Sequence, residues 1–203
     1  GGWEGNVKSL TQVDFFAFNL KRGSFLKGKL LDLDLDMKYN DKTGQLAIPM
    51  QEIMINKDDL IIGGNLNFSS DNTDYLIEIQ APSILFKDAK SLLSSHIISK
   101  LQPYDVKKPL EVHAYLSGKF KQGGDPLIRV NFKSNDNILS TRGETITDCS
   151  FTGIYTNEWK KGLPRKDPNS LIAFYNLKGN FYEIPFTADS IQISDLRDPV
   201  FTG

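Results

Sequence analysis

The stretch Leu31-Asp32-Leu33-Asp34-Leu35-Asp36-Met37-Lys38-Tyr39 alternates apolar and charged residues without interruption. Successive side chains of a β-strand point to opposite faces of a sheet, so this alternation gathers the apolar side chains on one face. A helical period would scatter the same leucines around the helix axis. The stretch therefore predicts a strand in a sheet with one apolar face and one solvated face.

The same alternation recurs further along the chain. It runs from Leu110 to Phe120 and again from Ile128 to Lys133. Ile53 and Ile55 flank Met54 just before Asn56-Lys57-Asp58-Asp59, a run of residues that favours a turn. Short strands separated by turns of Gly, Asn, Asp and Pro predict a mainly β protein with an antiparallel sheet.

One segment departs from the strand pattern. Between Phe86 and Leu101 the apolar residues recur every three or four positions, which is the period of an amphipathic helix. Asp88 suits the N-terminal end of that helix, and Pro103 ends it. We expect one short amphipathic helix that covers an end of the sheet. A helix lying on a membrane surface is the less favoured alternative, because the polar face mixes acidic and basic residues.

Two parts of the chain resemble each other, around residues 44–63 and 179–203. Each reads as Gly, then a short gap, then Ile-Pro and an apolar residue, then Ile-x-Ile before a turn. Because a proline cannot donate to a central strand ladder, we expect Pro49 and Pro185 to lie at a kink or an edge. Chance similarity between β sequences is the alternative.

A shorter echo, Phe-Thr-Gly, occurs at 151–153 and at 201–203. The first copy continues into a further strand pattern, whereas the second stands at the chain end. We therefore expect that the chain is one β-rich segment, residues 1–203, of a longer parent protein.

The composition argues against several classes of protein. The chain has 203 residues with 24 Lys and Arg against 25 Asp and Glu, a net charge of −1, which argues against a nucleic-acid-binding protein. A single cysteine, Cys149, excludes an internal disulfide, and two histidines leave little for a metal site. No stretch approaches the roughly 20 apolar residues that span a bilayer.

The motifs that would indicate a nucleotide or calcium site are incomplete. Gly23 to Lys29 has the spacing of a phosphate-binding loop, but Leu30 follows where Ser or Thr is required, and a strand pattern comes next. Asp32, Asp34 and Asp36 resemble the start of a calcium loop that then lacks its glycine and its glutamate. His96 and His113 look like ordinary surface or boundary histidines. We expect no enzyme activity, no metal and no cofactor.

A basic stretch contains Lys160, Lys161, Arg165 and Lys166 together with Gly162 and Pro164. A solvated loop is the simplest interpretation. Anionic lipid headgroups or a partner protein are the more specific alternatives.

Several motifs carry a resemblance to a known family. They are Gly124-Asp125-Pro126-Leu127-Ile128-Arg129-Val130-Asn131-Phe132, Cys149-Ser150-Phe151-Thr152-Gly153, Asp167-Pro168-Asn169-Ser170, Tyr175-Asn176-Leu177-Lys178-Gly179 and Ile184-Pro185-Phe186-Thr187-Ala188-Asp189. From about Pro82 to Gly203 the chain resembles the AsmA-like family, in particular its members in Bacteroidetes.

This resemblance implies a curled antiparallel sheet that forms a long apolar groove. It also implies a periplasmic segment of a parent anchored in the inner membrane, with a role in phospholipid transport and in outer-membrane biogenesis or maintenance. The expected partners are phospholipid acyl chains and other envelope proteins, with no nucleic acid. The candidate lining residues are the in-phase apolar ones: Leu31, Leu33, Leu35, Met37, Val112, Ala114, Leu116, Ile128, Val130 and Phe132.

Two other functions stay open at this point. A structural or adhesive β-module of the cell envelope would bury the same apolar faces in a closed sandwich core. A hydrolase acting on glycans would bring two carboxylates together in one cleft, about 5 to 9 Å apart.

Overall fold

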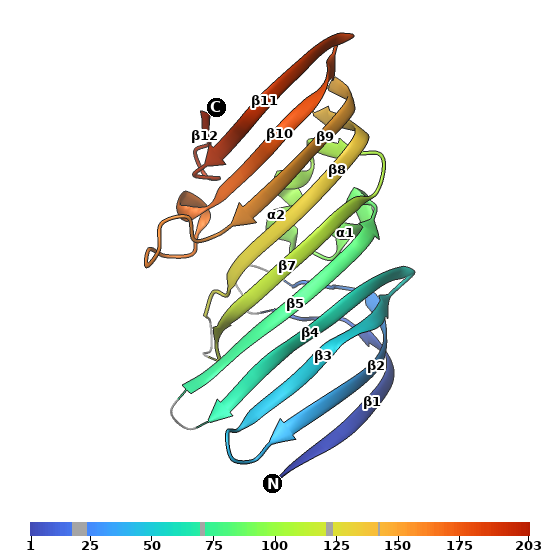
Figure 1. Cartoon of the computed structure of the whole chain (residues 1–203), viewed down its shortest axis with the longest axis vertical. Helices are drawn as coiled ribbons and strands as arrows, with labels where there is room; N and C mark the ends of the chain where they lie inside the picture. The colour runs from blue at the N-terminus through green and yellow to red at the C-terminus, as the bar shows by residue number, and fades with distance from the viewer. Residues whose placement is uncertain (18–23, 70–71, 121–123, 142) are drawn as a thin grey trace.

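The computed structural model describes residues 1–17, 24–69, 72–120, 124–141 and 143–203, so Gly23 of the loop-like stretch lies outside the described residues. The chain forms one 12-stranded sheet that does not close on itself, together with two short helices (Figure 1). The strands are β1 (Gly2–Val13), β2 (Lys29–Asn40), β3 (Gln45–Ile55), β4 (Asp58–Ser69), β5 (Asn72–Ile84), β6 (Tyr104–Val106), β7 (Leu110–Lys119), β8 (Leu127–Thr141), β9 (Glu144–Thr156), β10 (Leu171–Phe181), β11 (Ile184–Ser194) and β12 (Val200–Thr202). The helices are α1 (Phe86–Ser91) and α2 (Ser95–Leu101), and a 3₁₀ turn spans Asp167–Asn169. The predicted mainly β, antiparallel fold is confirmed.

The order of strands in the sheet follows the order of the chain, with one exception. Each strand pairs antiparallel with its neighbour in sequence, except that β5 pairs with β7 and the short β6 pairs with the far end of β8. The connection from β5 to β7 contains both helices, which lie behind the sheet in Figure 1. The chain therefore runs steadily from one end of the sheet, at β1, to the other, at β11 and β12.

The sheet has an apolar face and a polar face, and β2 shows both. Along this strand half-buried and exposed residues alternate from Lys29 to Asn40, as the sequence predicts. We call the face that carries Leu31 the apolar face, and the face that carries Asp32 the polar face. On the polar face Lys8 pairs with Asp34 at 2.8 Å.

The first core cluster lies on the apolar face. Ile53, Ile55, Leu60, Ala81 and Ile84 are its buried members. The partly buried side chains packed against them include Leu26, which precedes β2, and Ala89 and Leu92 of the helical segment. The backbone N–H of Leu26 also donates to the carbonyl of Leu92, at 3.0 Å. The helical segment thus covers part of the apolar face.

The predicted helix from Phe86 to Leu101 is not continuous. The helix α1 ends at Ser91, and α2 begins at Ser95 after an extended residue, Ser94, with φ −70° and ψ 153°. Serine is favoured at helix starts over helix interiors, because its hydroxyl competes for backbone groups. Ser94 is almost fully buried, so this break lies inside the packed structure.

The second core cluster lies on the same face in the C-terminal half. Cys149, Phe151 and Leu177 are buried there. Phe151 and Phe174 meet edge to face, with ring centroids 5.3 Å apart. This geometry is the preferred one for aromatic pairs.

Bulges bend several strands. The pairing of β3 with β4 shifts between Ile48 and Gln51, on either side of Pro49, so the predicted kink is present. Pro185 is the second residue of β11, where the only outer partner among the described strands, β12, pairs no further than Gln192. It therefore lies at an edge, the other position predicted for such a proline.

Candidate functional site

All ten candidate lining residues lie on the apolar face. Across β7 and β8 the register pairs Val112 with Phe132, Ala114 with Val130, and Leu116 with Ile128. In β2 the other four candidates, Leu31 to Met37, pair with alternate residues of β1. The alternation predicts that the apolar residues of each strand share one face of that strand. Only the fold shows that all three strands turn these residues to the same side of the sheet.

The candidates differ in how much of them is covered. Leu31, Leu33, Leu35 and Val112 pack against the first core cluster. Phe132 packs against the second. These five side chains therefore belong to packed cores. The other five, Met37, Ala114, Leu116, Ile128 and Val130, are half-buried and lie outside both clusters.

Further along β2, away from the first core cluster, the apolar face remains accessible. Paired residues form a row across four strands, from Trp3 through Tyr39 and Leu46 to Leu66. Trp3 is 49% exposed and its ring lies 5.8 Å from that of Tyr39. A shallow hollow of about 490 Å³ at the same corner is lined mostly by residues of the polar face, such as Glu4, Lys38 and Gln45, so it is separate from this row.

Two phenylalanines extend this surface. Phe68 at the end of β4 and Phe120 just after β7 stack at 5.2 Å, although Phe68 is 50% exposed and Phe120 is 43% exposed. We call the combined surface the open apolar region. Its members are Trp3, Val7, Met37, Tyr39, Leu46, Leu66, Phe68 and Phe120.

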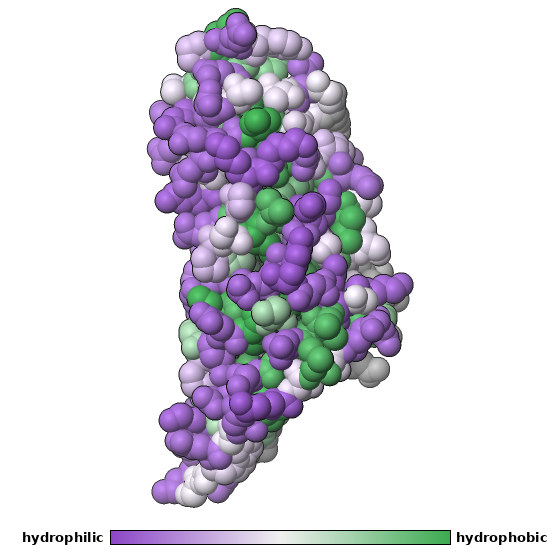
Figure 2. All heavy atoms as spheres, turned by 90° about the vertical axis from the view of Figure 1, so that its right-hand side faces the viewer, coloured by the Kyte–Doolittle hydropathy of each residue, from purple (hydrophilic) through white to green (hydrophobic). Residues whose placement is uncertain are grey.

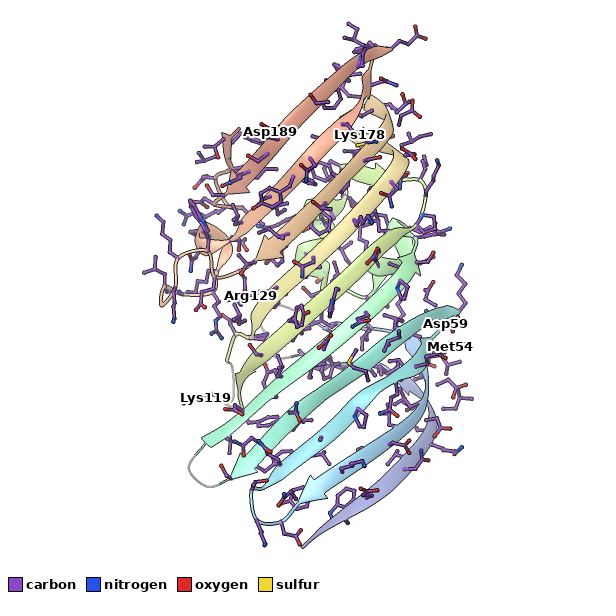
Figure 3. The ribbon with its side chains drawn as sticks, in the orientation of Figure 1. Met54, Asp59, Lys119, Arg129, Lys178 and Asp189 are labelled. Carbon is purple, nitrogen blue, oxygen red and sulfur yellow. The ribbon has the colours of Figure 1, made fainter. Side chains whose placement is uncertain are left out.

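Sequence reasoning missed most of this region. Trp3 and Phe68 each have polar or glycine neighbours, and the local alternation is too short to stand out. Figure 2 shows one side of the molecule, where apolar side chains gather in separate patches among hydrophilic ones. On the polar face, exposed apolar residues such as Leu10 and Met54 lie beside charged ones. Met54 lies next to Asp59 at the β3–β4 turn (Figure 3).

His113 joins a cluster of polar side chains on the polar face. Its Nε2 lies 2.6 Å from Oε1 of Glu78, and the Tyr115 hydroxyl lies 3.4 Å from its Nδ1. The amide of Gln80 donates to the same Glu78 oxygen at 3.0 Å. Hydrogen bonds from Gln80 and His113 lower the pKa of Glu78. The cluster therefore links β5 to β7 through an ionised carboxylate on an open sheet face, and His113 is more than an isolated surface residue.

Cys149 lies at the centre of the second core cluster and is fully buried. Burial raises the pKa of its thiol to about 11. The thiolate is the reactive form of cysteine, so the native protein holds this group inert at neutral pH.

We expect Cys149 to resist modification by a disulfide reagent at pH 8 until the protein is unfolded. Absorbance of the released thiol, followed with and without urea, measures this. Fast reaction of the native protein would show that the cluster opens readily.

Among the described residues, no group of three or more His, Cys, Asp or Glu side chains is placed to hold a metal ion. No helix in that part of the chain has the length and apolar character to cross a bilayer.

Comparison with known proteins identifies no relative. No protein-family model matches the chain, and no similar curated protein or solved structure was found.

Proposed function

We propose that this chain is a non-enzymatic segment that binds lipid acyl chains on its open apolar region. The observation that carries the proposal is the row from Trp3 to Leu66, which continues the apolar face beyond the covered cores. Large exposed apolar surfaces on ordered proteins commonly serve interactions. A curled sheet with one apolar face has the form needed to shield an acyl chain while its other face meets water.

A closed sandwich is the main alternative use of such strands. In a sandwich a second sheet covers the apolar face, with its strands packed about 10 Å away. Here the described strands belong to one sheet, and Trp3 and Phe68 remain about half exposed. The structure thus favours an accessible face over a dry core at the end of β1 to β4 that carries Trp3 and Phe68.

The energetics suit reversible binding. Each methylene removed from water contributes about 0.8 kcal/mol, so even part of an acyl chain could be held by this surface. One chain of that size gives marginal, reversible attachment in membranes as well.

The wider role rests on the sequence resemblance to the AsmA-like family. We infer a periplasmic location, a parent anchored in the inner membrane, and participation in phospholipid transport and outer-membrane biogenesis or maintenance. Other envelope proteins are the expected macromolecular partners. A structural or adhesive module is the alternative that remains if no lipid binds.

Lipid contact can be tested by photo-crosslinking in matched positions. A photoreactive amino acid at Met37 reports on the apolar face, and one at Met54 reports on the polar face. After purification without detergent, we expect native mass spectrometry to detect phospholipid and crosslinks to form from Met37 only. Absence of lipid, or equal crosslinking from both positions, would contradict the proposal.

We expect Met37→Asp to reduce the bound phospholipid at least roughly tenfold. A charge beside an acyl chain costs more than the ~1.4 kcal/mol that such a change requires. Met54→Asp is the matched control and should leave lipid content unchanged. Thermal unfolding of both variants separates lost binding from lost folding.

A further inference from the structure

The loop between β9 and β10 displays large apolar and basic side chains together. Its sequence from 158 to 166 reads Glu-Trp-Lys-Lys-Gly-Leu-Pro-Arg-Lys. Trp159 is 46% exposed and Leu163 is 50% exposed. Figure 1 shows this loop projecting past the ends of the neighbouring strands.

The loop is held in shape from beneath by one buried asparagine. Asn169 accepts from the backbone N–H of Lys160 at 2.8 Å and donates to the carbonyls of Lys160 and Leu163, at 3.0 and 3.3 Å. The N–H of Trp159 donates to the Asn169 carbonyl at 2.9 Å. The exposed side chains are therefore presented on an ordered backbone, which lowers the entropy lost on binding.

The charges on this loop are unevenly distributed. Its two acidic side chains are paired, Glu158 with Arg165 at 3.3 Å and Asp167 with Lys100 of α2. Lys160, Lys161 and Lys166 are exposed. The ammonium of Lys160 lies 5.3 Å from the centre of the Trp159 ring. Arg129, which pairs with Thr156 just before the loop, lies at the same end of the strands as Lys119 (Figure 3).

We propose that this loop docks the protein on an anionic lipid bilayer. Tryptophan favours the boundary between headgroups and acyl chains, and lysine keeps its charge in the headgroups while its methylenes pack below. Basic residues near a surface of anionic lipid add favourable energy that falls with salt. Trp159 and Leu163 would insert, and the three lysines would contact lipid phosphates. This docking is independent of acyl-chain binding on the open apolar region.

Vesicle co-sedimentation tests the docking directly. We expect the full chain to bind phosphatidylcholine vesicles that contain phosphatidylglycerol, to bind pure phosphatidylcholine weakly, and to be released by high salt. In a Trp3→Phe background, Trp159 emission should shift to shorter wavelength on binding. Equal binding to both vesicle types, or no change in Trp159 emission, would overturn the proposal.

Charge variants make the test specific. Replacing Lys160, Lys161 and Lys166 together by Gln should weaken vesicle binding roughly 100-fold. Replacing Lys87, Lys133 and Lys178 by Gln removes the same charge from exposed positions elsewhere and should change binding by less than about threefold. Equal losses in both triple variants would show nonspecific attraction and contradict a docking loop.

The two lipid proposals can fail separately. The loop variant should keep any phospholipid that co-purifies with the native chain, while Met37→Asp should keep vesicle binding. Loss of both properties in either variant would show that one surface serves both, which contradicts an independent docking loop.

Discussion

Asn137→Ala is expected to destabilise the fold by about 3 kcal/mol. The side chain is fully buried, and its oxygen accepts from the backbone N–H groups of Lys108 and Ile138, each at 2.8 Å. Its amide donates to the carbonyl of Lys108 at 3.0 Å. The Asn137→Ala change leaves two N–H groups and one carbonyl without their hydrogen-bond partner. Each unsatisfied buried group costs about 1 to 3 kcal/mol.

The asparagine acts where the chain enters β7 beside the bulge of β8. The pairing of β8 with β9 shifts between Ser134 and Asn137, so not every backbone N–H and carbonyl there has a hydrogen-bond partner on the neighbouring strand. Urea unfolding measures the expected loss of stability. Asn135→Ala is the matched control, because Asn135 lies two residues away and is exposed. A loss below about 0.5 kcal/mol for Asn137→Ala, as for an ordinary surface change, would contradict this account.

Gly153→Val is expected to cost about 3 kcal/mol or more. Gly153 pairs with Phe132 on one side and with Phe174 on the other. The two rings come together at 5.8 Å, even though β9 separates their strands. A Cβ at Gly153 would lie 2.1 Å from the nearest atom of the Phe132 ring. The ring must leave its position, and overpacking of this kind typically costs 1 to 3 kcal/mol before the lost aromatic contacts are counted.

Thr152→Val provides the control for Gly153→Val. It adds a β-branched apolar residue to the neighbouring position of β9, where the side chain is exposed. The control should change the midpoint of thermal unfolding little, whereas Gly153→Val should lower it by about 10 °C or more. Similar midpoints for the two variants would show that the Phe132 ring does not occupy the space that a side chain at position 153 needs.

Local patterns in the sequence predicted the strands well. The alternation in Leu31 to Tyr39 identifies β2 with both of its faces, because each strand side chain has one choice of side. The turn at Asn56 is confirmed, although Asp58 and Asp59 already belong to β4. The amphipathic period of 86–101 also identifies helical structure but passes over the break at Ser94, since a period in apolar residues does not register a buried serine.

Contacts between residues far apart in the chain could not be predicted from the sequence. No local pattern reveals that β2 and β7 turn their apolar sides the same way, or that Leu92 packs against the first core cluster while Trp3 remains accessible. The same limit hides Asn137 and Gly153. A polar residue and a glycine in a strand pattern look like weak points until the residues on adjacent strands are known.

The strand order also determines how the molecule responds to mechanical load. The two ends of the described chain lie at opposite ends of the sheet, and β1 and β12 have only one neighbouring strand each (Figure 1). Tension applied between the termini would peel the outermost strand first, opening its backbone hydrogen bonds a few at a time, because these bonds run across the strands. Each released strand exposes the next, so extension should proceed in steps of about one strand at modest force. From the C-terminal end, the second core cluster would be disturbed as soon as β11 follows β12, because Phe186 and Ile191 of β11 pack against it.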